Sequence, residues 1–309
     1  MKTLVVIRTP FQAWLVQRVL EKEKVVNFDL VYFTQNNSEE DKYYYNQLTL
    51  KAARADYIFV KPKRFDIISH MFFRLKANKW YKNANYTSVI FASINALVPN
   101  SLISKHRKAK LITFDDGAAN IVSKGIFCNE SSSIRFRTYR FLIGTVPLNV
   151  IKKRISYHYT MYRLYDNIIE NERLRYIDCF NKNNDNKSNI TKTYFIGAPF
   201  KETMSQEQIS RLENYVKNLK VDFYITHPRE RKNLNIGVEV LNKYGRIAEE
   251  AIIADAGDCP IILIGWFSTV MLNIGPLCES RIVLLPKDSL QTPELFELSK
   301  KAGCTPILI

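Results

Sequence analysis

The 309-residue chain contains few of the features that mark secreted, metal-binding or membrane-spanning proteins. Its five cysteines lie far apart, with no C-x-x-C and no paired spacing, so neither a disulfide framework nor a cysteine metal site is predicted. The apolar run at the N-terminus stops at Arg8, too early for a signal peptide, and no later run reaches membrane-spanning length without charges. These absences predict a cytoplasmic protein.

The motifs of several enzyme classes are missing as well. No G-x-x-x-x-G-K-[ST] is present, which excludes a P-loop, and no G-x-G-x-x-G follows the first apolar run, which disfavours a dinucleotide enzyme. G-x-S-x-G and H-E-x-x-H are also absent. Asp115 and Asp116 are adjacent and lack the one-residue gap of a metal-binding D-x-D motif. We therefore predict neither a metal nor another cofactor.

The composition is that of a globular protein with a strong positive charge. Hydrophobic residues make up 46% of the chain and aromatic residues 12%, and the formal net charge is +15. This charge favours an anionic partner such as a nucleotide or an anionic membrane surface. The basic residues occur in small groups and are not interleaved with aromatic residues in one stripe, so we do not predict a nucleic-acid-binding protein.

Short apolar runs alternate with segments of helical spacing in the first part of the chain. Strands are predicted over residues 3–7, 28–34, 55–61, 86–93 and 109–114, with helices over 11–24 and 94–108. Residues 150–180, rich in Tyr and Arg, are predicted to be helical in part. The alternation indicates an α/β domain with a parallel, doubly wound sheet.

The same alternation restarts after a polar, Asn-rich linker at residues 181–189. Strands are predicted over residues 192–197, 221–226, 260–265 and 281–286, the last strand of the chain, with helices over 205–219, 247–255 and from 268. We therefore predict two Rossmann-like domains facing each other across a cleft, one over residues 1–185 and one over 190–309.

Polar groups follow the carboxyl ends of four predicted strands, where ligands bind in such sheets. They are Asp115-Asp116-Gly117, Gly197-Ala198-Pro199, His227 and Ser268. Because side chains alternate along a strand, the two aspartates should face different ways, and one can point into a cleft while the other caps the next turn. Gly117 permits a tight turn or the close approach of a ligand. A plain turn is the alternative for this stretch.

Two of these strand ends suit an anion. A proline follows His227, so the imidazole would be held rigidly. Arg229 can clamp a phosphate or pair with Glu230. Ser268 and Thr269 stand where a strand gives way to a helix, whose first N–H groups and hydroxyls can bind an anion. The alternative for this serine is an ordinary helix cap.

Eight short motifs, in the same order, resemble glycosyltransferase family 52, which includes the lipooligosaccharide sialyltransferases. They are RTPFQ (8–12), YYYNQL (43–48), FASI (91–94), FDDGAAN (114–120), HYT (158–160), GAPFKE (197–202), HPRE (227–230) and FST (267–269). The resemblance covers nearly the whole chain.

The resemblance implies an inverting, metal-independent transferase of the GT-B fold. It would move sialic acid from CMP-sialic acid to a terminal galactose of a lipooligosaccharide, another glycolipid or a capsular oligosaccharide, in an α-2,3 linkage. The N-terminal domain would bind the acceptor and the C-terminal domain the nucleotide sugar. The alternatives are a GT-B transferase of another nucleotide sugar, such as CMP-Kdo or a UDP-sugar, and an inactive member. Relatives of this kind can form homodimers, and the basic surface would draw the protein to the inner face of the cytoplasmic membrane.

The resemblance also implies roles for single residues. His227 matches the histidine that contacts or protonates the departing phosphate, and we expect an imidazolium there because the phosphate raises its pKa. The other nucleotide-sugar contacts would be Gly197, Ala198, Pro199, Pro228, Arg229, Glu249, Ser268 and Thr269. On the acceptor side stand Thr9, Gln12, Asp116 and Gly117.

Phe200 departs from the family pattern, since the residue after G-x-P is an aspartate base in the best-understood members. A phenyl ring cannot take a proton. We therefore predict Asp115 as the base, with Asp116 as its structural neighbour. Glu202 is the alternative base, and different acceptor chemistry or weak activity is a third interpretation.

Overall fold

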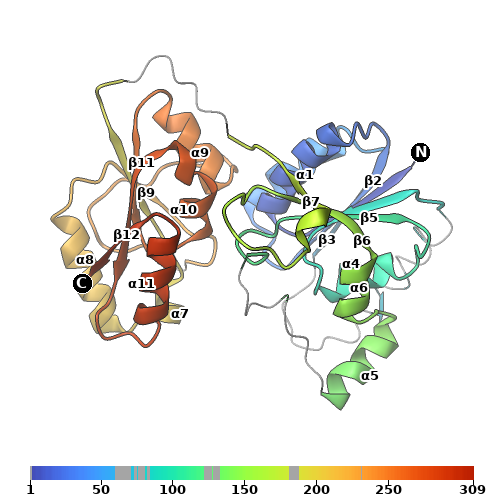
Figure 1. Cartoon of the computed structure of the whole chain (residues 1–309). Helices are drawn as coiled ribbons and strands as arrows, with labels where there is room; N and C mark the ends of the chain where they lie inside the picture. The colour runs from blue at the N-terminus through green and yellow to red at the C-terminus, as the bar shows by residue number, and fades with distance from the viewer. Residues whose placement is uncertain are drawn as a thin grey trace. The chain divides into compact units, whose positions relative to one another are not determined.

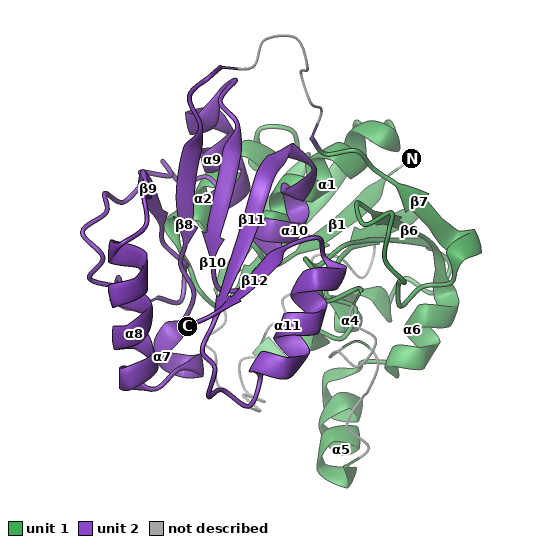
Figure 2. Ribbon diagram, turned by 60° about the vertical axis from the view of Figure 1, so that its left-hand side comes forward, with its two compact units in different colours: residues 1–179 green, residues 180–309 purple. Residues whose placement is uncertain are grey.

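The computed structural model describes residues 2–59, 71, 72, 75, 81, 84–121, 127, 133–180, 188–230 and 232–309. The chain divides into two compact units, residues 1–179 and 180–309 (Figures 1 and 2). Each unit is built on one sheet of parallel strands with helices beside it, so the prediction of an α/β chain with two parallel-sheet domains is confirmed. The linker predicted at 181–189 lies mostly outside the described residues.

Unit 1 contains a seven-stranded parallel sheet in the order β3-β2-β1-β4-β5-β6-β7. The strands are β1 (Thr3–Ile7), β2 (Phe28–Thr34), β3 (Arg54–Phe59), β4 (Ser88–Phe91), β5 (Lys110–Phe114), β6 (Ile155–Thr160) and β7 (Leu174–Tyr176). The described helices are α1 (Pro10–Lys22), α2 (Glu39–Thr49), α4 (Leu97–Ile103), α5 (Ile134–Ile143), α6 (Leu148–Arg154) and the short 3-10 helix η1 (Asn171–Arg173). This is the Rossmann strand order, which reverses direction between β1 and β4.

Unit 2 contains a five-stranded parallel sheet in the order β12-β11-β10-β8-β9. The strands are β8 (Lys192–Ile196), β9 (Phe223–Ile225), β10 (Ile261–Gly265), β11 (Cys278–Leu285) and β12 (Thr305–Leu308). The helices are α7 (Phe200–Thr203), α8 (Gln206–Lys217), α9 (Ala248–Ala256), α10 (Thr269–Asn273), α11 (Thr292–Lys301) and the 3-10 helix η2 (Gly275–Leu277). The strand order reverses between β8 and β10, which makes this the switch point where ligands bind in open α/β sheets.

The central strands are apolar because helices cover both faces of a parallel sheet. All five residues of β1 and all seven of β2 are buried. Helix α1 begins where the Thr9 hydroxyl accepts a hydrogen bond from the N–H of Gln12, and Pro10 suits the first turn. Trp14 and Val19 on this helix are fully buried. Each such side chain contributes about 1.5–3 kcal/mol by burial.

Two parts of the sequence prediction need correction. The helix predicted within residues 150–180 ends at Arg154, and residues 155–160 form strand β6. This segment is rich in β-branched and aromatic side chains, which favour a strand once β5 is beside it. The strand ending near residue 286 is not the last, because β12 follows it at the sheet edge. No helix of the described residues is long and apolar enough to cross a membrane.

Candidate active site

The start of helix α1 and two loops at the carboxyl end of the unit 1 sheet meet in one hydrogen-bonded group at the switch point. Gln12 Nε2 donates to Ser93 Oγ (2.7 Å) and to Asp116 Oδ1 (2.6 Å). Ser93 Oγ donates to Asp116 Oδ2 (2.6 Å), and Asn120 Oδ1 accepts the backbone N–H of Asp116 (2.7 Å). We call these four residues the Asp116 network. Gln12 comes from the first turn of α1, which follows β1, and the other three come from the loops after β4 and β5.

The residues that hydrogen-bond to Asp116 are more buried than Asp116 itself. Gln12, Ser93 and Asn120 are at most 2% exposed, whereas Asp116 itself is half-buried. The Gln12 amide is oriented by the backbone N–H of Arg8, which donates to Oε1 (2.8 Å). Ser93 has a φ of +52°, a region that non-glycine residues seldom adopt and that is often found at functional sites. The network therefore presents one partly exposed carboxylate in a fixed position.

Asp115 has a different environment. Its side chain is fully buried, Oδ1 accepts from His158 Nε2 (3.0 Å), and Oδ2 accepts the backbone N–H of Met161 (2.8 Å). His158 is buried too, and its Nδ1 is hydrogen-bonded to Thr113 Oγ1 (2.9 Å). Asp115 thus fastens β5 to β6 and to the loop that follows β6. The structure places the base predicted from the sequence in the core, and leaves Asp116 as the partly exposed carboxylate of the pair.

The other acceptor-side residues shape these loops. The Thr9 hydroxyl caps α1 by accepting the N–H of Gln12 (3.2 Å). Gly117 has a φ of +58°, which lets the chain turn sharply directly after Asp116. Both residues therefore stand beside the Asp116 network, and each has a local backbone role.

The switch point of unit 2 is formed by the loops after β8 and β10, which are neighbouring strands. At Gly197 a Cβ atom would come within 2.8 Å of the Ile225 carbonyl oxygen, so only glycine fits. Ala198 is buried behind it. Ser268 is the N-cap residue of α10, yet its side chain does not cap the helix. Its Oγ is buried without a hydrogen-bond partner in the described part of the chain.

An unpaired buried hydroxyl is uncommon in native proteins and points to a missing polar partner. The ordinary helix cap considered for Ser268 is therefore not what the structure shows. Thr269, the first residue of α10, is half-buried next to it.

His227 is held in a tight turn after β9. Its Nδ1 accepts the backbone N–H of Arg229 (3.1 Å), and its own N–H donates to Glu230 Oε2 (3.2 Å). The Tyr224 hydroxyl donates to the other oxygen of Glu230. Because Nδ1 is an acceptor, the neutral ring carries its proton on Nε2. Burial, helped by the charges of Arg229 and Lys243, lowers the pKa of His227 to about 4. The residue is thus a neutral N–H donor at neutral pH in the free protein, whereas the imidazolium expected from the sequence concerned the phosphate-bound state.

The residues around this turn are paired differently from the prediction. Arg229 forms an ion pair with Glu202 (3.1 Å) and not with Glu230. Both partners of this pair are more than half exposed, so the pair adds little stability. Phe200 is 3% exposed and stacks on Phe195 with 6.3 Å between ring centroids, so it belongs to the core of unit 2.

Glu249 lies in the first turn of α9 and is 5% exposed. Its Oε1 accepts from Asn273 Nδ2 (2.7 Å), which ties it to α10, the helix that begins after Ser268. Burial raises the pKa of Glu249. The contact brings this carboxyl, predicted to hold the nucleotide, to the helix that carries Ser268 and Thr269.

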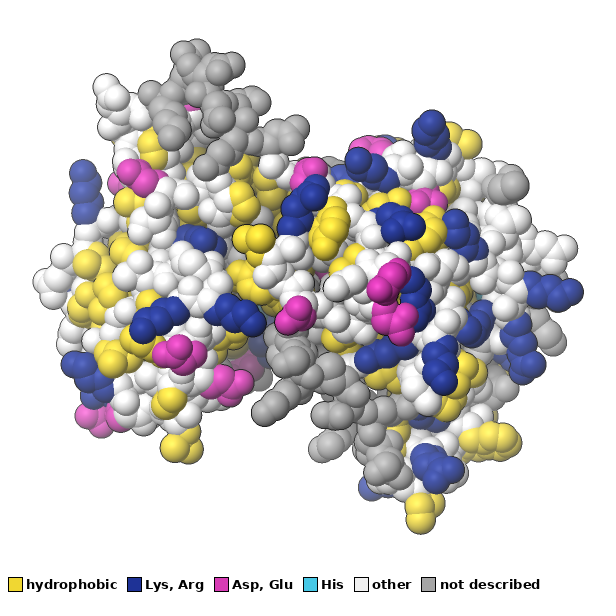
Figure 3. Space-filling model, viewed as in Figure 1, with side chains coloured by type: hydrophobic (Ala, Val, Ile, Leu, Met, Phe, Trp, Pro, Cys, Tyr) yellow, Lys and Arg dark blue, Asp and Glu magenta, His cyan; other side chains and the backbone are white. Residues whose placement is uncertain are grey.

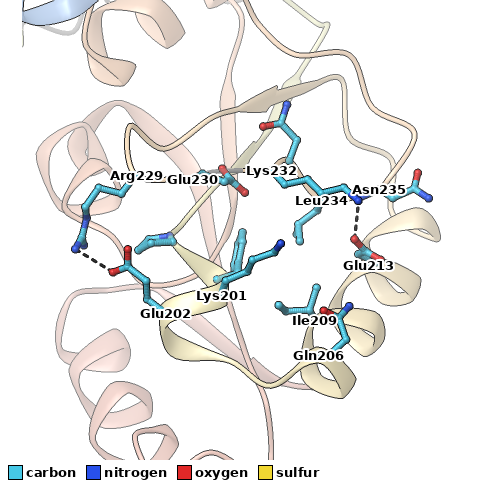
Figure 4. A pocket seen from close by; sticks show the side chains of 13 residues that line it. Lys201, Glu202, Gln206, Ile209, Glu213, Arg229, Glu230, Lys232, Leu234 and Asn235 are labelled. Atoms are coloured by element: carbon cyan, nitrogen blue, oxygen red, sulfur yellow. Dashed lines mark hydrogen bonds and ion pairs between the residues drawn. The ribbon is translucent and has the colours of Figure 1, made fainter. Parts of the chain in front are cut away.

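A pocket of about 460 Å³ adjoins the loops of Pro199 and Arg229 (Figure 4). It is lined by Pro199, Phe200, Lys201, Glu202, Gln206, Ile209, Glu213, Arg229, Glu230, Lys232, Asn233, Leu234 and Asn235. Figure 4 shows the Arg229–Glu202 pair on one side and Glu213, which accepts the N–H of Asn235 (2.8 Å), on the other. The pocket has the size of a small-ligand site, and its charged and amide groups surround a few apolar side chains.

The predicted residues therefore fall into two groups, one at the carboxyl end of each sheet. Four residues not predicted as site residues complete these groups, namely Ser93, Asn120, His158 and Asn273. Ser93 could have been found, because it ends a predicted strand next to a motif of the family. Asn273 has no comparable signal, because only the packing of α9 beside α10 brings it to Glu249. Among the described residues, no three His, Cys, Asp or Glu side chains are arranged as metal ligands.

Solved structures with a similar fold include GT-B glycosyltransferases. The glycotransferase of kitacinnamycin aligns with a TM-score of 0.55 and 9% identity, over all of this chain and 86% of its own. UGT2 of Phytolacca americana aligns with a TM-score of 0.51 and 7% identity, over 99% of this chain and 85% of its own. At these identities the likeness shows the fold alone.

Sequence relatives are bacterial. An N-acetyllactosaminide alpha-2,3-sialyltransferase of Haemophilus influenzae is 28% identical over 69% of this chain and 67% of its own length. The enzyme of the same name from Neisseria meningitidis is 26% identical over 77% of this chain and 66% of its own length. A CMP-N-acetylneuraminate:beta-galactoside alpha-2,3-sialyltransferase of Pasteurella multocida is 23% identical over 88% and 86% of the two chains. The model of glycosyltransferase family 52 matches residues 26–288, and the chain therefore belongs to this family.

Proposed function

We propose that the protein is an inverting sialyltransferase that moves sialic acid from CMP-sialic acid to a terminal galactose of a glycolipid or capsular oligosaccharide, in an α-2,3 linkage. Membership of glycosyltransferase family 52 and the names of its three relatives support this reaction. The observation that carries it is the Asp116 network, which holds a partly exposed carboxylate at the ligand-binding edge of unit 1.

Asp116 is the base in this proposal, and Asp115 is its structural neighbour. The acceptor hydroxyl gives its proton to Asp116 while its oxygen attacks the anomeric carbon of sialic acid. The bond from that carbon to the CMP phosphate oxygen breaks on the opposite face, so the configuration inverts. A positioned base of this kind contributes about 10²–10⁴-fold to the rate. Gln12 and Ser93 act as positioning residues for the carboxylate.

The leaving phosphate is received by hydrogen-bond donors of unit 2. The Nε2–H of His227 and the hydroxyl of Ser268 donate to the phosphate oxygens, where negative charge develops. A phosphate monoester has a second pKa of about 6, so the CMP that leaves at neutral pH needs no proton from the enzyme. A neutral His227 is sufficient for this step, and we propose that no metal is required.

The remaining groups of unit 2 hold the nucleotide. The carboxyl of Glu249, kept next to α10 by Asn273, can bind ribose hydroxyls. Gly197 lets the loop after β8 pack closely against Ile225 and Glu230, where a Cβ atom would come within 2.8 Å of the Ile225 carbonyl oxygen, and so sets the position of that loop beside the nucleotide. The pocket beside Pro199 and Arg229 has room for a sugar unit.

The test is CMP release from CMP-sialic acid with and without lactose, with product mass measured, for the wild type, Asp116→Asn and His227→Ala. We expect acceptor-dependent CMP release and a sialylated product from the wild type, and loss of both in the two variants. Binding of CMP and UDP is measured in parallel. A protein that binds UDP and not CMP would show that the donor is a UDP-sugar, and one that binds neither would refute the transferase proposal.

A further inference from the structure

Arg8 lies beside the Asp116 network at the carboxyl end of the unit 1 sheet. It directly follows β1, and its backbone N–H donates to Gln12 Oε1 (2.8 Å). The Nε2 of the same amide donates to Asp116 Oδ1 (2.6 Å). One amide group therefore joins the backbone of Arg8 to the proposed base. The side chain of Arg8, which is half-buried, takes no part in these bonds.

The Arg8 side chain is held by two neutral groups, one on β2 and one in the loop that follows it. The guanidinium carbon lies 5.7 Å from the ring centroid of Phe33, which is buried, and Nη2 donates to Gln35 Oε1 (2.7 Å). No carboxylate pairs with Arg8 among the residues that the structure describes. A guanidinium has five N–H donors and no acceptor, so Arg8 keeps its positive charge and most of its donors free for a ligand.

The lack of a carboxylate partner distinguishes Arg8 from several other basic residues. Figure 3 shows Lys and Arg side chains spread over the visible faces of both units, several of them next to Asp or Glu side chains. Ion pairs with carboxylates, at 2.5–3.1 Å, are formed for example by Lys2, Arg163, Arg173 and Arg211. Surface charge alone therefore does not locate a site, whereas an arginine fixed only by neutral groups can accept an anion.

The loop after β2, which carries Gln35, is held in place by Asp41. This residue is fully buried, and its Oδ1 accepts the Tyr32 hydroxyl (2.7 Å). Its Oδ2 accepts the Thr34 hydroxyl (2.9 Å) and the backbone N–H of Ser38 (2.9 Å). A carboxylate is buried at this depth only when its oxygens are hydrogen-bonded, and these bonds fix both ends of the loop. Gln35, which is exposed, is thus presented to solvent from a preorganised backbone.

The paired side chains of Arg8 and Gln35 offer chiefly donors to a ligand. The amide oxygen of Gln35 already accepts from Arg8, which leaves its NH₂ group beside the guanidinium. A group that only accepts hydrogen bonds and carries negative charge matches this set. Arginine binds carboxylates and phosphates with two parallel, charge-assisted hydrogen bonds, whereas a neutral hydroxyl would leave the charge unmatched.

We infer that Arg8 and Gln35 bind an acidic group, a carboxylate or a phosphate, which the acceptor carries on a sugar that follows its terminal galactose. This inference rests on the proposed function, in which Asp116 removes the proton of the galactose hydroxyl. Asp116 follows β5 and Gln35 follows β2, with β4 and β1 between these strands. Because neighbouring strands are about 4.8 Å apart, this edge of the sheet spans roughly 15 Å, enough for a short oligosaccharide.

The first experiment compares lactobionate and lactitol as acceptors of the full chain. Both carry an open-chain unit after the galactose, and only lactobionate has a carboxylate on it. We expect the KM of the wild type to be about tenfold lower for lactobionate, as for one charge-assisted hydrogen-bonded pair, and the difference to shrink as salt is added. Lactose 1-phosphate and lactose repeat the comparison for a phosphate, and the larger of the two preferences identifies the acidic group.

Two variants should abolish this preference for the acidic acceptor. Arg8→Gln removes the charge, and Gln35→Glu sets a carboxylate beside the guanidinium that occupies it. Arg8→Lys keeps the charge without the planar fork and should retain part of the preference. The matched control is Arg107→Gln, which removes the same charge from an exposed residue that precedes β5, at the opposite edge of the sheet. It should keep the full preference, and Tm confirms that each variant is folded.

The second experiment needs neither the donor nor galactose. Saturation-transfer NMR measures binding of gluconate and glucose 1-phosphate to the full chain, with sorbitol and glucose as the neutral counterparts. We expect the wild type to bind at least one of the acids better than its counterpart, and Arg8→Gln to lose this difference. If that result is obtained while the wild type does not turn over CMP-sialic acid, the transferase proposal fails and the anion site at Arg8 stands.

Three results would overturn the inference. One is a wild type that binds neither acid better than its neutral counterpart. Another is an acidic preference that survives in Arg8→Gln or disappears equally in Arg107→Gln, since either would trace it to the overall charge. The third is a variant Arg8→Gln that raises the KM for CMP-sialic acid and keeps the acceptor preference, which would assign the guanidinium to the carboxylate of the donor.

Discussion

The polar groups at the carboxyl ends of the two sheets differ in whether they already have hydrogen-bond partners. In unit 1, both oxygens of Asp116 are already hydrogen-bonded, by Gln12 and Ser93. In unit 2, the Ser268 hydroxyl has no partner within the described residues, and the proton of His227 is on the ring nitrogen that makes no hydrogen bond there. A base must be held in place before the acceptor arrives, whereas an anion site keeps its donors free for the ligand. The comparison supports our proposal of proton removal in unit 1 and phosphate binding in unit 2.

The largest effect is expected from removing the proposed base of unit 1. Asp116→Asn should lower kcat/KM for CMP-sialic acid and lactose by about 10²–10⁴-fold, because an amide cannot take the proton. Tm should stay close to that of the wild type, since the residue is half-buried and its amide oxygen can still accept a hydrogen bond.

Asp115→Asn is the matched control for this prediction. It should destabilise the protein by about 1–3 kcal/mol, measured by urea unfolding, because a buried amide N–H₂ would face the N–H of Met161 or the His158 ring. The folded variant should keep most of its turnover. If Asp115→Asn abolishes turnover at normal stability and Asp116→Asn does not, the base is Asp115.

The next largest effect is expected from removing the proposed phosphate-binding donor of unit 2. His227→Ala should lower turnover by about 10²–10³-fold, the usual loss for one donor to a developing negative charge. A neutral donor in the same place, His227→Gln, should recover part of the rate. If His227→Gln is as inactive as His227→Ala, while both bind CMP like the wild type, the histidine acts by proton transfer and not as a neutral donor.

A smaller effect sharpens the assignment of Ser93 as a positioning residue. Ser93→Ala removes one hydrogen bond to Asp116 and should reduce kcat about tenfold, corresponding to about 1.4 kcal/mol. KM for the acceptor should change little. Ser93→Gly relieves the positive φ and should be more stable than Ser93→Ala, with the same reduced kcat. Equal stability of the two variants would show that the backbone at Ser93 is not strained.

Ser268→Ala should act on binding with no loss of stability. Removing a hydroxyl that has no protein partner should leave Tm unchanged or slightly higher, because no hydrogen bond within the described residues is broken. The Kd for CMP, measured by calorimetry, should rise about tenfold. A large fall in Tm with unchanged Kd would assign Ser268 to folding and contradict its role in the anion site.

The smallest effect concerns the pH dependence of stability. An unfolded histidine has its ordinary pKa of 6.5, and His227 in the folded protein has a pKa of about 4. Between these values the unfolded chain binds more protons, so this residue makes stability fall as the pH is lowered from about 6.5 to about 4. His227→Gln lacks that contribution. Its free energy of unfolding, from urea titrations across this range, should therefore fall less than that of the wild type.

The position of the site could be predicted from the sequence, because parallel strands end at a common edge. The end of the strand at 109–114 led to Asp116 and the family resemblance led to Gln12, and the structure joins these two residues directly. The environments of the two aspartates could not be predicted. Asp115 is buried by partners that follow it by more than forty residues, and no local pattern encodes that contact.

The parts of the fold that were missed have a similar cause. Strands β7 and β12 lie at sheet edges, have only three and four residues, and show no clean alternation. Whether such a segment becomes a strand depends on the neighbour it meets, which is a property of the folded chain. The Arg229–Glu202 pair was missed for the same reason, because Glu230 is next in sequence but is already bound by Tyr224 and the N–H of His227.

The sequence by itself determined the alternation of strands and helices, the polar residues at the strand ends and the motifs of glycosyltransferase family 52. These depend on side-chain order along the chain, which is local information. Only the tertiary structure decided that Asp115 is buried and Asp116 is not, and that His227 carries its proton on Nε2. It also decided that the Arg8 guanidinium meets the amide of Gln35. Each of these depends on burial and on partners far away in sequence, and burial is set by the packing of the whole unit.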